Sequence, residues 1–310
     1  MFPLAIPSQL WLHLLPVGLR LIIYLYAKHL FMVLIADSGS SKTGWRLTNK
    51  GTVLPFHTEG LNPYYKTIDQ IKAVLQKDLI PHLPCKPADI SHIYFYGAGC
   101  SVPIKCDEVK KALSDCFTNA EVHVEHDILG AARACCGHDK GIVCILGTGS
   151  NSCYYDGTNT TETIGGLGFI LGDEGSGGHI GKSIVAAYLN REMPEDLRTD
   201  FYNTYRMDRA AIDKKVYQEP NFNKFLGTFS MFAAKHINHP FIQHLLKDCL
   251  GLFLDKHVCR YTDYKTTTVH FVGSVAYYYK DILIDLCHKR GIKTGNFIHE
   301  PVDELVGFHK

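Results

Sequence analysis

The chain has 310 residues, of which 46% are hydrophobic and 20% are charged, and its formal net charge is +1. This balance suits a folded protein with a buried core and excludes a disordered chain, which needs low hydrophobicity and high net charge. The 32 basic side chains form no block or stripe, so we expect no nucleic-acid partner. The length predicts about two domains.

The 11 cysteines are odd in number and include no C-x-x-C pair. We therefore expect reduced thiols and a cytoplasmic protein rather than a disulfide framework. The nearest approaches to a metal motif are His123-Val-Glu-His126 and Cys135-Cys136-Gly-His138. Each lacks a second pair of ligands, so neither is expected to hold a structural metal.

Residues 1–31 differ from the rest of the chain. They are apolar, but prolines interrupt any helix, and Arg20 and Lys28 interrupt any membrane span. A secretory signal carries positive charge before its apolar region, whereas the first positive side chain here is Arg20. We interpret this stretch as a non-native leader and Met32 as the true start, with a membrane anchor or a signal as the alternative. No membrane partner is expected.

The first half of the remaining chain alternates between strands and helices. Apolar runs predict buried strands, and apolar side chains on one face predict helices. In chain order we expect a strand at 32–36 closed by a turn at 37–41, a returning strand at 45–48, a helix at 67–79, a strand at 90–96, a helix capped by Asp107, a strand at 122–124 and a helix at 128–136 opened by Asp127.

The second half repeats the alternation, which is typical of an α/β protein. We expect a strand at 142–146, a turn at 147–151, a returning strand at 152–155, a glycine-rich stretch at 165–178, helices at 179–191, 223–238 and 240–261, a strand at 269–272, and a helix from Gly273-Ser274 to Arg290.

One local pattern occurs in both halves: an apolar strand, a Gly/Ser/Thr turn and a returning strand. Its two copies, at Asp37 and Gly147, lie about 110 residues apart, the length of one domain. We therefore predict a structural duplication with lobes at 32–138 and 139–295. Residues 296–310 could pack back on the first lobe.

Both turns suit phosphate binding, because Gly, Ser and Thr leave backbone N–H groups accessible and add hydroxyl donors. Either turn alone could be an ordinary tight turn, but two could grip one polyphosphate from both sides. Asp37 is the candidate carboxylate for Mg²⁺, or an Asx turn residue. The candidate phosphate ligands are Gly39, Ser40, Ser41, Lys42 and Thr43 in the first turn and Gly147, Thr148 and Gly149 in the second; Lys42 could equally be an exposed turn lysine.

Two other nucleotide-binding signatures are not matched by the sequence. Residues 176–183 read S-G-G-H-I-G-K-S, so Ser176 stands where a Walker A loop requires its first glycine. No G-x-G-x-x-G follows a strand, which argues against a dinucleotide dehydrogenase.

Four stretches resemble motifs of the actin/hexokinase/Hsp70 superfamily of ATP-binding folds. The first phosphate motif, D-x-G-x-[ST]-[KST]-T, matches Asp37–Thr43, and the second matches Leu146–Asn151. The sugar-loop signature, G-G-x-G-x-x-x-G-D-E-G-S, is complete at Gly165–Ser176, and an adenosine motif occurs at Phe271–Ala276. Within the superfamily the chain resembles the N-acetylglucosamine kinase branch of the BadF/BadG/BcrA/BcrD ATPases.

The resemblance implies an α/β, two-lobed actin-like ATPase (ribonuclease H-like) fold with duplicated domains, a central cleft and ATP at its base. It implies that Asp127 activates the acceptor, although an aspartate before a helix could also be an N-cap. Asp173 could instead be a surface residue of a flexible loop, and Ser274 an N-cap. The implied sugar ligands are Asn62, Ser150, Gly166, Asp173 and Gly177, and the implied adenosine ligands are Gly273 and Ser274.

The function implied is ATP- and Mg²⁺-dependent phosphorylation of the 6-hydroxyl of an N-acetylhexosamine, with N-acetylglucosamine as the first choice. Tyr64 replaces the tryptophan of the N-acetylglucosamine kinases and Ile164 replaces a common cysteine, so N-acetylmuramate and glucosamine stay open as acceptors. One alternative is an ATPase activator of a 2-hydroxyacyl-CoA dehydratase or benzoyl-CoA reductase, for which Cys135-Cys136 is a poor iron–sulfur match. Another is a non-catalytic binding module. A homodimer is possible.

Overall fold

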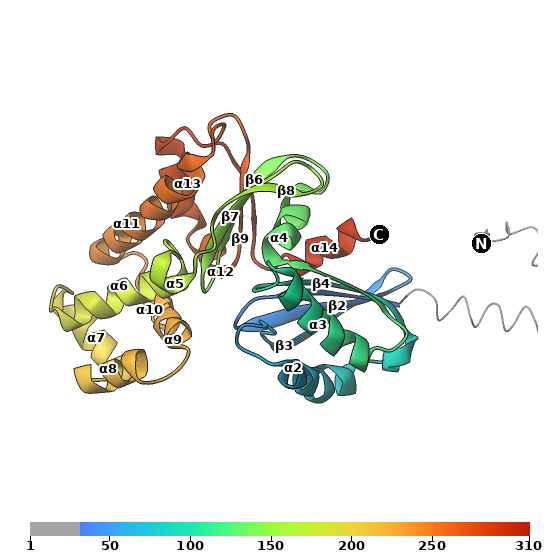
Figure 1. The fold of residues 1–310 in the computed structure, drawn as a ribbon. Coiled ribbons are helices and arrows are strands. Elements are labelled where there is room, and N and C mark those ends of the chain that lie inside the picture. Colours follow the sequence, from blue (N-terminus) through green and yellow to red (C-terminus); the bar gives the residue numbers. More distant parts are fainter. Residues whose placement is uncertain (1–31) are drawn as a thin grey trace, which may run out of the picture.

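The computed structural model describes residues 32–310, so the prediction of a non-native leader lies outside the described residues. Two five-stranded sheets form the centres of two lobes (Figure 1). The first has the order β3-β2-β1-β4-β5, from β1 (Met32–Ser38), β2 (Lys42–Asn49), β3 (Thr52–Glu59), β4 (Ile90–Gly97) and β5 (Glu121–His126). The second has the order β10-β9-β6-β7-β8, from β6 (Gly141–Leu146), β7 (Ser150–Tyr155), β8 (Thr160–Gly165), β9 (Val269–Val272) and β10 (Thr294–Ile298).

The two sheets share one topology. In each, three strands form an antiparallel meander, a fourth strand pairs in parallel with the first strand of that meander, and a fifth pairs in parallel with the fourth. Strand β1 therefore corresponds to β6, and the two Gly/Ser/Thr turns occupy equivalent positions. The predicted two-lobed α/β fold is confirmed.

The central strands are apolar because both faces of each sheet are covered. Leu34–Ala36 of β1 and Ile142–Cys144 of β6 are buried. The edge strand β3, which the sequence analysis did not predict, has mostly exposed side chains and contains Pro55. It lacks the apolar run that identifies a buried strand, and proline is tolerated on an edge.

Helices α2 (Ile68–Val74) and α3 (Pro103–Cys116) pack on the outer face of the first sheet over Trp45 and Phe95, and Phe117 at the end of α3 joins the same core. Thr67 and Gln70 form a capping box for α2, and a π-helical turn, Leu75–Leu79, continues it. The expectation that Asp107 caps the second helix is wrong. Helix α3 begins four residues earlier, at Pro103, because proline suits the first helical position.

The second lobe contains most of the helices. Its helices are α5 (Gly168–Leu171), α6 (Gly177–Leu189), α7 (Glu195–Tyr205), α8 (Arg209–Tyr217), α9 (Phe222–Thr228), α10 (Ser230–Lys235), α11 (Pro240–Lys256), α12 (Ser274–Tyr278) and α13 (Lys280–Lys289). Three predicted helices are shorter or interrupted: α9 and α10 break at Phe229, α11 gives way to a 3₁₀ turn at Val258–Arg260, and Tyr279 separates α12 from α13.

Two helices lie between the sheets: α4 (Asp127–Cys136), which follows β5, and α14 (Val302–Phe308), which follows β10 (Figure 1). They share a core with both sheets, in which Ile35 comes from β1, Val143 from β6, Ala132 from α4 and Leu305 from α14. Arg46 of β2 forms a two-point ion pair with Asp303 of α14, at 2.6 and 2.9 Å. Each of these helices therefore begins where the two lobes meet. Among residues 32–310 no helix is long and apolar enough to cross a membrane.

Candidate active site

The turn between β1 and β2 is held by its own backbone and hydroxyl groups. The Gly39 N–H donates to the Lys42 carbonyl oxygen at 2.9 Å. Thr43 is fully buried, and its hydroxyl lies 2.8 Å from that of Ser38 and donates to the Glu59 carbonyl oxygen. Of the predicted phosphate ligands in this turn, Thr43 therefore fixes the hairpin, while Ser40 is exposed at its tip.

The turn between β6 and β7 meets the first turn. The Gly147 N–H donates to the Gly149 carbonyl oxygen at 3.0 Å, which leaves Thr148 at the tip. The Thr148 hydroxyl oxygen lies 3.3 Å from that of Ser41. Two glycine-hydroxyl hairpins from different sheets are thus in contact, which is the arrangement needed to hold one polyphosphate between them.

Two glycines pack against the second hairpin. The N–H groups of Gly177 and Gly178, in the first turn of α6, donate to the carbonyl oxygens of Gly147 and Thr148 at 2.8 and 3.2 Å. Gly177, predicted to line the sugar site, is therefore buried with its N–H already bonded to the hairpin.

Gly273 also lies beside this hairpin, with φ at +107°. A Cβ there would lie 2.5 Å from the Leu146 carbonyl oxygen, so only glycine allows this approach. Gly273 also occupies the N-cap of α12. The alternative that Ser274 is this cap is therefore wrong, because Ser274 is the first helical residue.

Asp127 is the first residue of α4, where its carboxylate accepts a hydrogen bond from the Ile128 N–H at 2.9 Å. His126 occupies the N-cap, so the alternative that Asp127 is itself the cap is not what the helix shows. Burial raises the pKa of Asp127 to about 6, although the Ile128 N–H acts in the opposite direction. Burial therefore has the larger effect on this carboxylate.

Asp37 lies near the end of β1, close to two other carboxylates. Burial raises its pKa to about 7, and the negative charges of Asp127 and Glu300 add to this effect. Such crowding favours either a bound proton or a nearby cation. Among residues 32–310 no three His, Cys, Asp or Glu side chains are grouped to ligate a metal directly. Asp37, beside two further carboxylates, has the donor chemistry of a site where Mg²⁺ keeps several waters and takes one or two carboxylates.

Glu300 is a charged residue of this region that the sequence analysis missed. It stands between β10 and α14, and it binds Lys42 at 2.5 Å. Lys42, predicted to contact phosphate, is thus paired with a carboxylate from the segment between β10 and α14. A signal existed in the sequence: His299-Glu300 repeats His126-Asp127 at the equivalent strand–helix junction of the duplicated lobe.

Asn62 lies behind the first hairpin and is 7% exposed. Its amide nitrogen donates to the Ser40 hydroxyl at 2.9 Å, and its amide oxygen accepts from the Tyr64 N–H at 2.9 Å. The predicted sugar ligand therefore links the segment around Gly60 to the phosphate hairpin. A Cβ at Gly60 would lie 2.4 Å from the Gly39 carbonyl oxygen, which shows how closely the two segments pack.

Asp173 and Ser150 lie together beside the second hairpin. The Asp173 carboxylate accepts from the Ser150 N–H at 2.9 Å, and burial raises its pKa. The Ser150 side chain is 4% exposed, and within the described part of the chain its hydroxyl oxygen has no partner. A buried hydroxyl without a partner is rare, so this pair could satisfy a sugar hydroxyl. Gly166 is exposed nearby, against Asn151.

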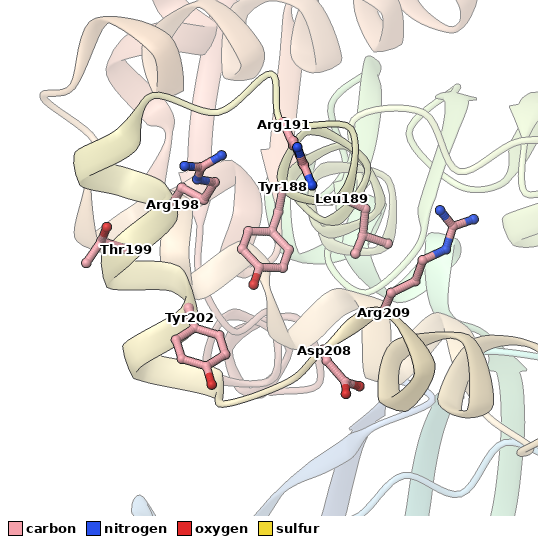
Figure 2. Close-up of a pocket in the computed structure, with 8 residues that line it drawn as sticks. All are labelled: Tyr188, Leu189, Arg191, Arg198, Thr199, Tyr202, Asp208 and Arg209. Carbon is pink, nitrogen blue, oxygen red and sulfur yellow. The ribbon is translucent and has the colours of Figure 1, made fainter.

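A pocket of the second lobe is a separate feature. It has a volume of about 420 Å³ and lies among α6, α7 and the start of α8 (Figure 2). Its lining residues are Tyr188, Leu189, Arg191, Arg198, Thr199, Tyr202, Asp208 and Arg209. No predicted site residue is among them.

The chain is similar to solved structures of sugar kinases, although no family model and no curated protein matches it. The putative N-acetylglucosamine kinase of Porphyromonas gingivalis is 39% identical over 90% of this chain and 98% of that chain, with a TM-score of 0.86. That of Chromobacterium violaceum is 17% identical over 91% and 100%, with a TM-score of 0.65. A ROK family glucokinase of Streptomyces griseus, in complex with glucose and AMPPNP, is 14% identical over 90% and 98%, with a TM-score of 0.52.

The last two likenesses show the shared fold alone, which is the two-lobed actin-like ATPase fold. The narrower resemblance to the BadF/BadG/BcrA/BcrD family stays a prediction, since no family model matches the chain.

Proposed function

Since the chain belongs to the same family as the Porphyromonas gingivalis protein, we propose that it is an ATP-dependent kinase that phosphorylates the 6-hydroxyl of an N-acetylhexosamine, with N-acetylglucosamine as the first acceptor to test. The observation that carries the proposal is the 3.3 Å contact between the hydroxyl groups of Ser41 and Thr148. It brings the two predicted phosphate hairpins together at the lobe junction where Asp127 begins α4.

Phosphoryl transfer depends mainly on positioning and on neutralising charge. The backbone N–H groups and hydroxyls of the two hairpins would bind the phosphates, and Gly273 and Ser274 would let adenosine approach the backbone. Mg²⁺ at Asp37 would neutralise phosphate charge. Asp127 would accept the proton of the sugar hydroxyl, and a pKa of about 6 leaves it ionised at neutral pH yet basic enough to do so.

The acceptor would be held from both lobes. Asp173 and the unpartnered Ser150 hydroxyl would bind sugar hydroxyls from the second lobe, and Asn62 and Gly166 would complete the site. Tyr64 is 59% exposed beside Asn62, so it stands where it could select among amino sugars. Glucosamine and N-acetylmuramate are therefore the acceptors to compare with N-acetylglucosamine.

The structure offers no support for the ATPase activator alternative. A cluster shared between subunits needs cysteines at the surface, whereas Cys135 belongs to the buried core between the lobes and burial raises the pKa of Cys136 to about 12.

The test is ADP release measured with ATP, Mg²⁺ and a panel of amino sugars. We expect release to depend on sugar, and to disappear with 6-deoxy-N-acetylglucosamine, which lacks the proposed acceptor oxygen. Mass spectrometry of the product should show one added phosphate. ADP release that no sugar stimulates would contradict the proposal.

A further inference from the structure

The glycine-rich loop, Gly165–Ser176, carries Asp173 between β8 and α6, and a segment outside every predicted motif contacts both of its ends. This segment, Lys256–Tyr261, runs from the end of α11 through the 3₁₀ turn. We call it the α11 clamp. Four glycines of the loop have positive φ, among them Gly165 at +102° and Gly175 at +70°.

These two glycines are needed for close packing on α11. A Cβ at Gly165 would lie 2.3 Å from the His257 ring, and one at Gly175 would lie 2.7 Å from Phe253. Neither distance can be accommodated without moving the loop away from the helix. The two glycines therefore keep the ends of the loop against α11, whatever ligand the loop binds.

His257 joins the two ends directly. Its Nδ1 lies 3.1 Å from the Ile164 carbonyl oxygen, just before the loop, and its Nε2 lies 3.2 Å from the Glu174 carboxylate, near the end of the loop. The side chain is 3% exposed and stacks on Phe253 with ring centroids 4.6 Å apart. Both ring nitrogens therefore face oxygen atoms, one at each end of the loop.

Glu174 is the carboxylate that His257 contacts near the end of the loop. Its carboxylate also accepts from Lys256 at 2.7 Å. Burial raises its pKa, but hydrogen bonds from Lys256 and His257 outweigh this and lower the pKa to about 2. The carboxylate is thus held as an anion, directly after Asp173, whose φ is +62°.

Tyr261 completes the clamp at the first end of the loop. Its hydroxyl oxygen accepts from the Ile164 N–H at 3.2 Å and lies 2.9 Å from the Ser152 hydroxyl. Both polar groups of the Ile164 backbone are therefore bound by the clamp, one by His257 and one by Tyr261. From there β7 leads back to Ser150, the partner of Asp173.

From these contacts we propose that His257 is a positioning residue of the phosphoryl-transfer site. It ties Ile164 to Glu174 so that the loop presents Asp173 beside Ser150 in the geometry that binds the acceptor sugar. The proposal rests on the proposed function, since it assigns His257 an effect on sugar affinity. It does not place His257 in contact with sugar or nucleotide.

The experiment compares His257→Phe, which keeps the ring packing on Phe253 but loses both hydrogen bonds, with the wild type. Losing a buried charged hydrogen bond predicts a KM for N-acetylglucosamine raised by roughly 10- to 100-fold, with the KM for ATP changed less than about 2-fold. His257→Gln keeps one donor and should give an intermediate KM. His244→Phe, on an exposed side chain of the same helix, is the matched control and should leave both KM values unchanged.

Hydrogen exchange of the amides of residues 165–176 gives a readout that needs no sugar. The clamp predicts faster exchange in His257→Phe than in wild type, and normal exchange in His244→Phe. A lower kcat with unchanged KM values and unchanged loop exchange would show a merely structural role and overturn the proposal. If the wild type phosphorylates no sugar, the proposed function fails. The role of His257 in holding the loop is then judged by hydrogen exchange alone, and exchange unchanged in His257→Phe would overturn it. If His257→Phe does not fold, His257→Gln carries both measurements.

Discussion

At the scale of single residues, Asp127 and Asp37 show what burial does to a carboxylate at a working site. Both have a raised pKa, near 6 and near 7.

For Asp127 the ionised form is the active one, so kcat/KM should fall as the pH drops below about 6. Asp127→Asn should lose ~10²–10⁴ in kcat, and a pH–rate profile of wild type and variant checks both. Asp107→Asn, on an exposed side chain of α3, is the control, and near-normal turnover by Asp127→Asn would remove Asp127 from the mechanism.

Asp37 carries a stability cost. Its pKa is higher in the folded chain than in the unfolded one, so the folded state binds the proton more tightly and stability falls as the pH rises from about 4 to 7. Asp37→Asn removes the charge, and at pH 8 without Mg²⁺ it should stabilise the protein by about 1 kcal/mol or more, a few degrees in Tm. Thermal unfolding at pH 8 and pH 4 tests this, because the gain should vanish at pH 4, where wild-type Asp37 is protonated. A gain of equal size at both pH values would contradict the charge explanation.

At the scale of elements, the strand–turn–strand units were predictable and their long-range partners were not. Strands β1 and β6 follow from short apolar runs ending in Gly, Ser and Thr. The start of α3 was not predicted, because Pro103 rather than Asp107 fixes it. His257 and Glu300 reach the site through tertiary packing, far in sequence from the groups they contact, so no local pattern identifies their partners. The repeated His-acid pair at the two strand–helix junctions was the one signal for Glu300.

Gly273, in the turn between β9 and α12, lies close to the second hairpin, so a larger residue there should disturb the nucleotide site. Gly273→Ala adds a Cβ 2.5 Å from the Leu146 carbonyl oxygen at a positive φ, a strain of about 1–3 kcal/mol. The turn should move away from the hairpin, raising the KM for ATP several-fold with little change in that for sugar. Gly51→Ala has a φ of +90° and no atom within 4 Å of the new Cβ, so it separates backbone strain from the contact. Equal KM values for ATP in both variants would mean that the contact does not shape the nucleotide site.

At the scale of the whole molecule, the two lobes share one buried core through α4 and α14, so we expect them to unfold together. Leu305 of α14 is fully buried in that shared core. Leu305→Ala should cost about 2–5 kcal/mol and lower the midpoint of both lobes equally. With Trp11 replaced by Phe, Trp45 fluorescence reports the first lobe, because Trp45 is buried in the core of that lobe, while far-UV circular dichroism reports mainly the helices of the second.

Leu113→Ala, in the core of the first lobe alone, is the comparison. If the shared core couples the lobes, the fluorescence and dichroism transitions should coincide in both variants, because loss of either core then unfolds the whole chain. If the lobes are independent, Leu113→Ala should shift the Trp45 transition and leave the dichroism transition of the second lobe in place. That separation would also mean that α4 and α14 connect the lobes without making them one folding unit. The contact between the Ser41 and Thr148 hairpins would then depend on bound nucleotide for its stability.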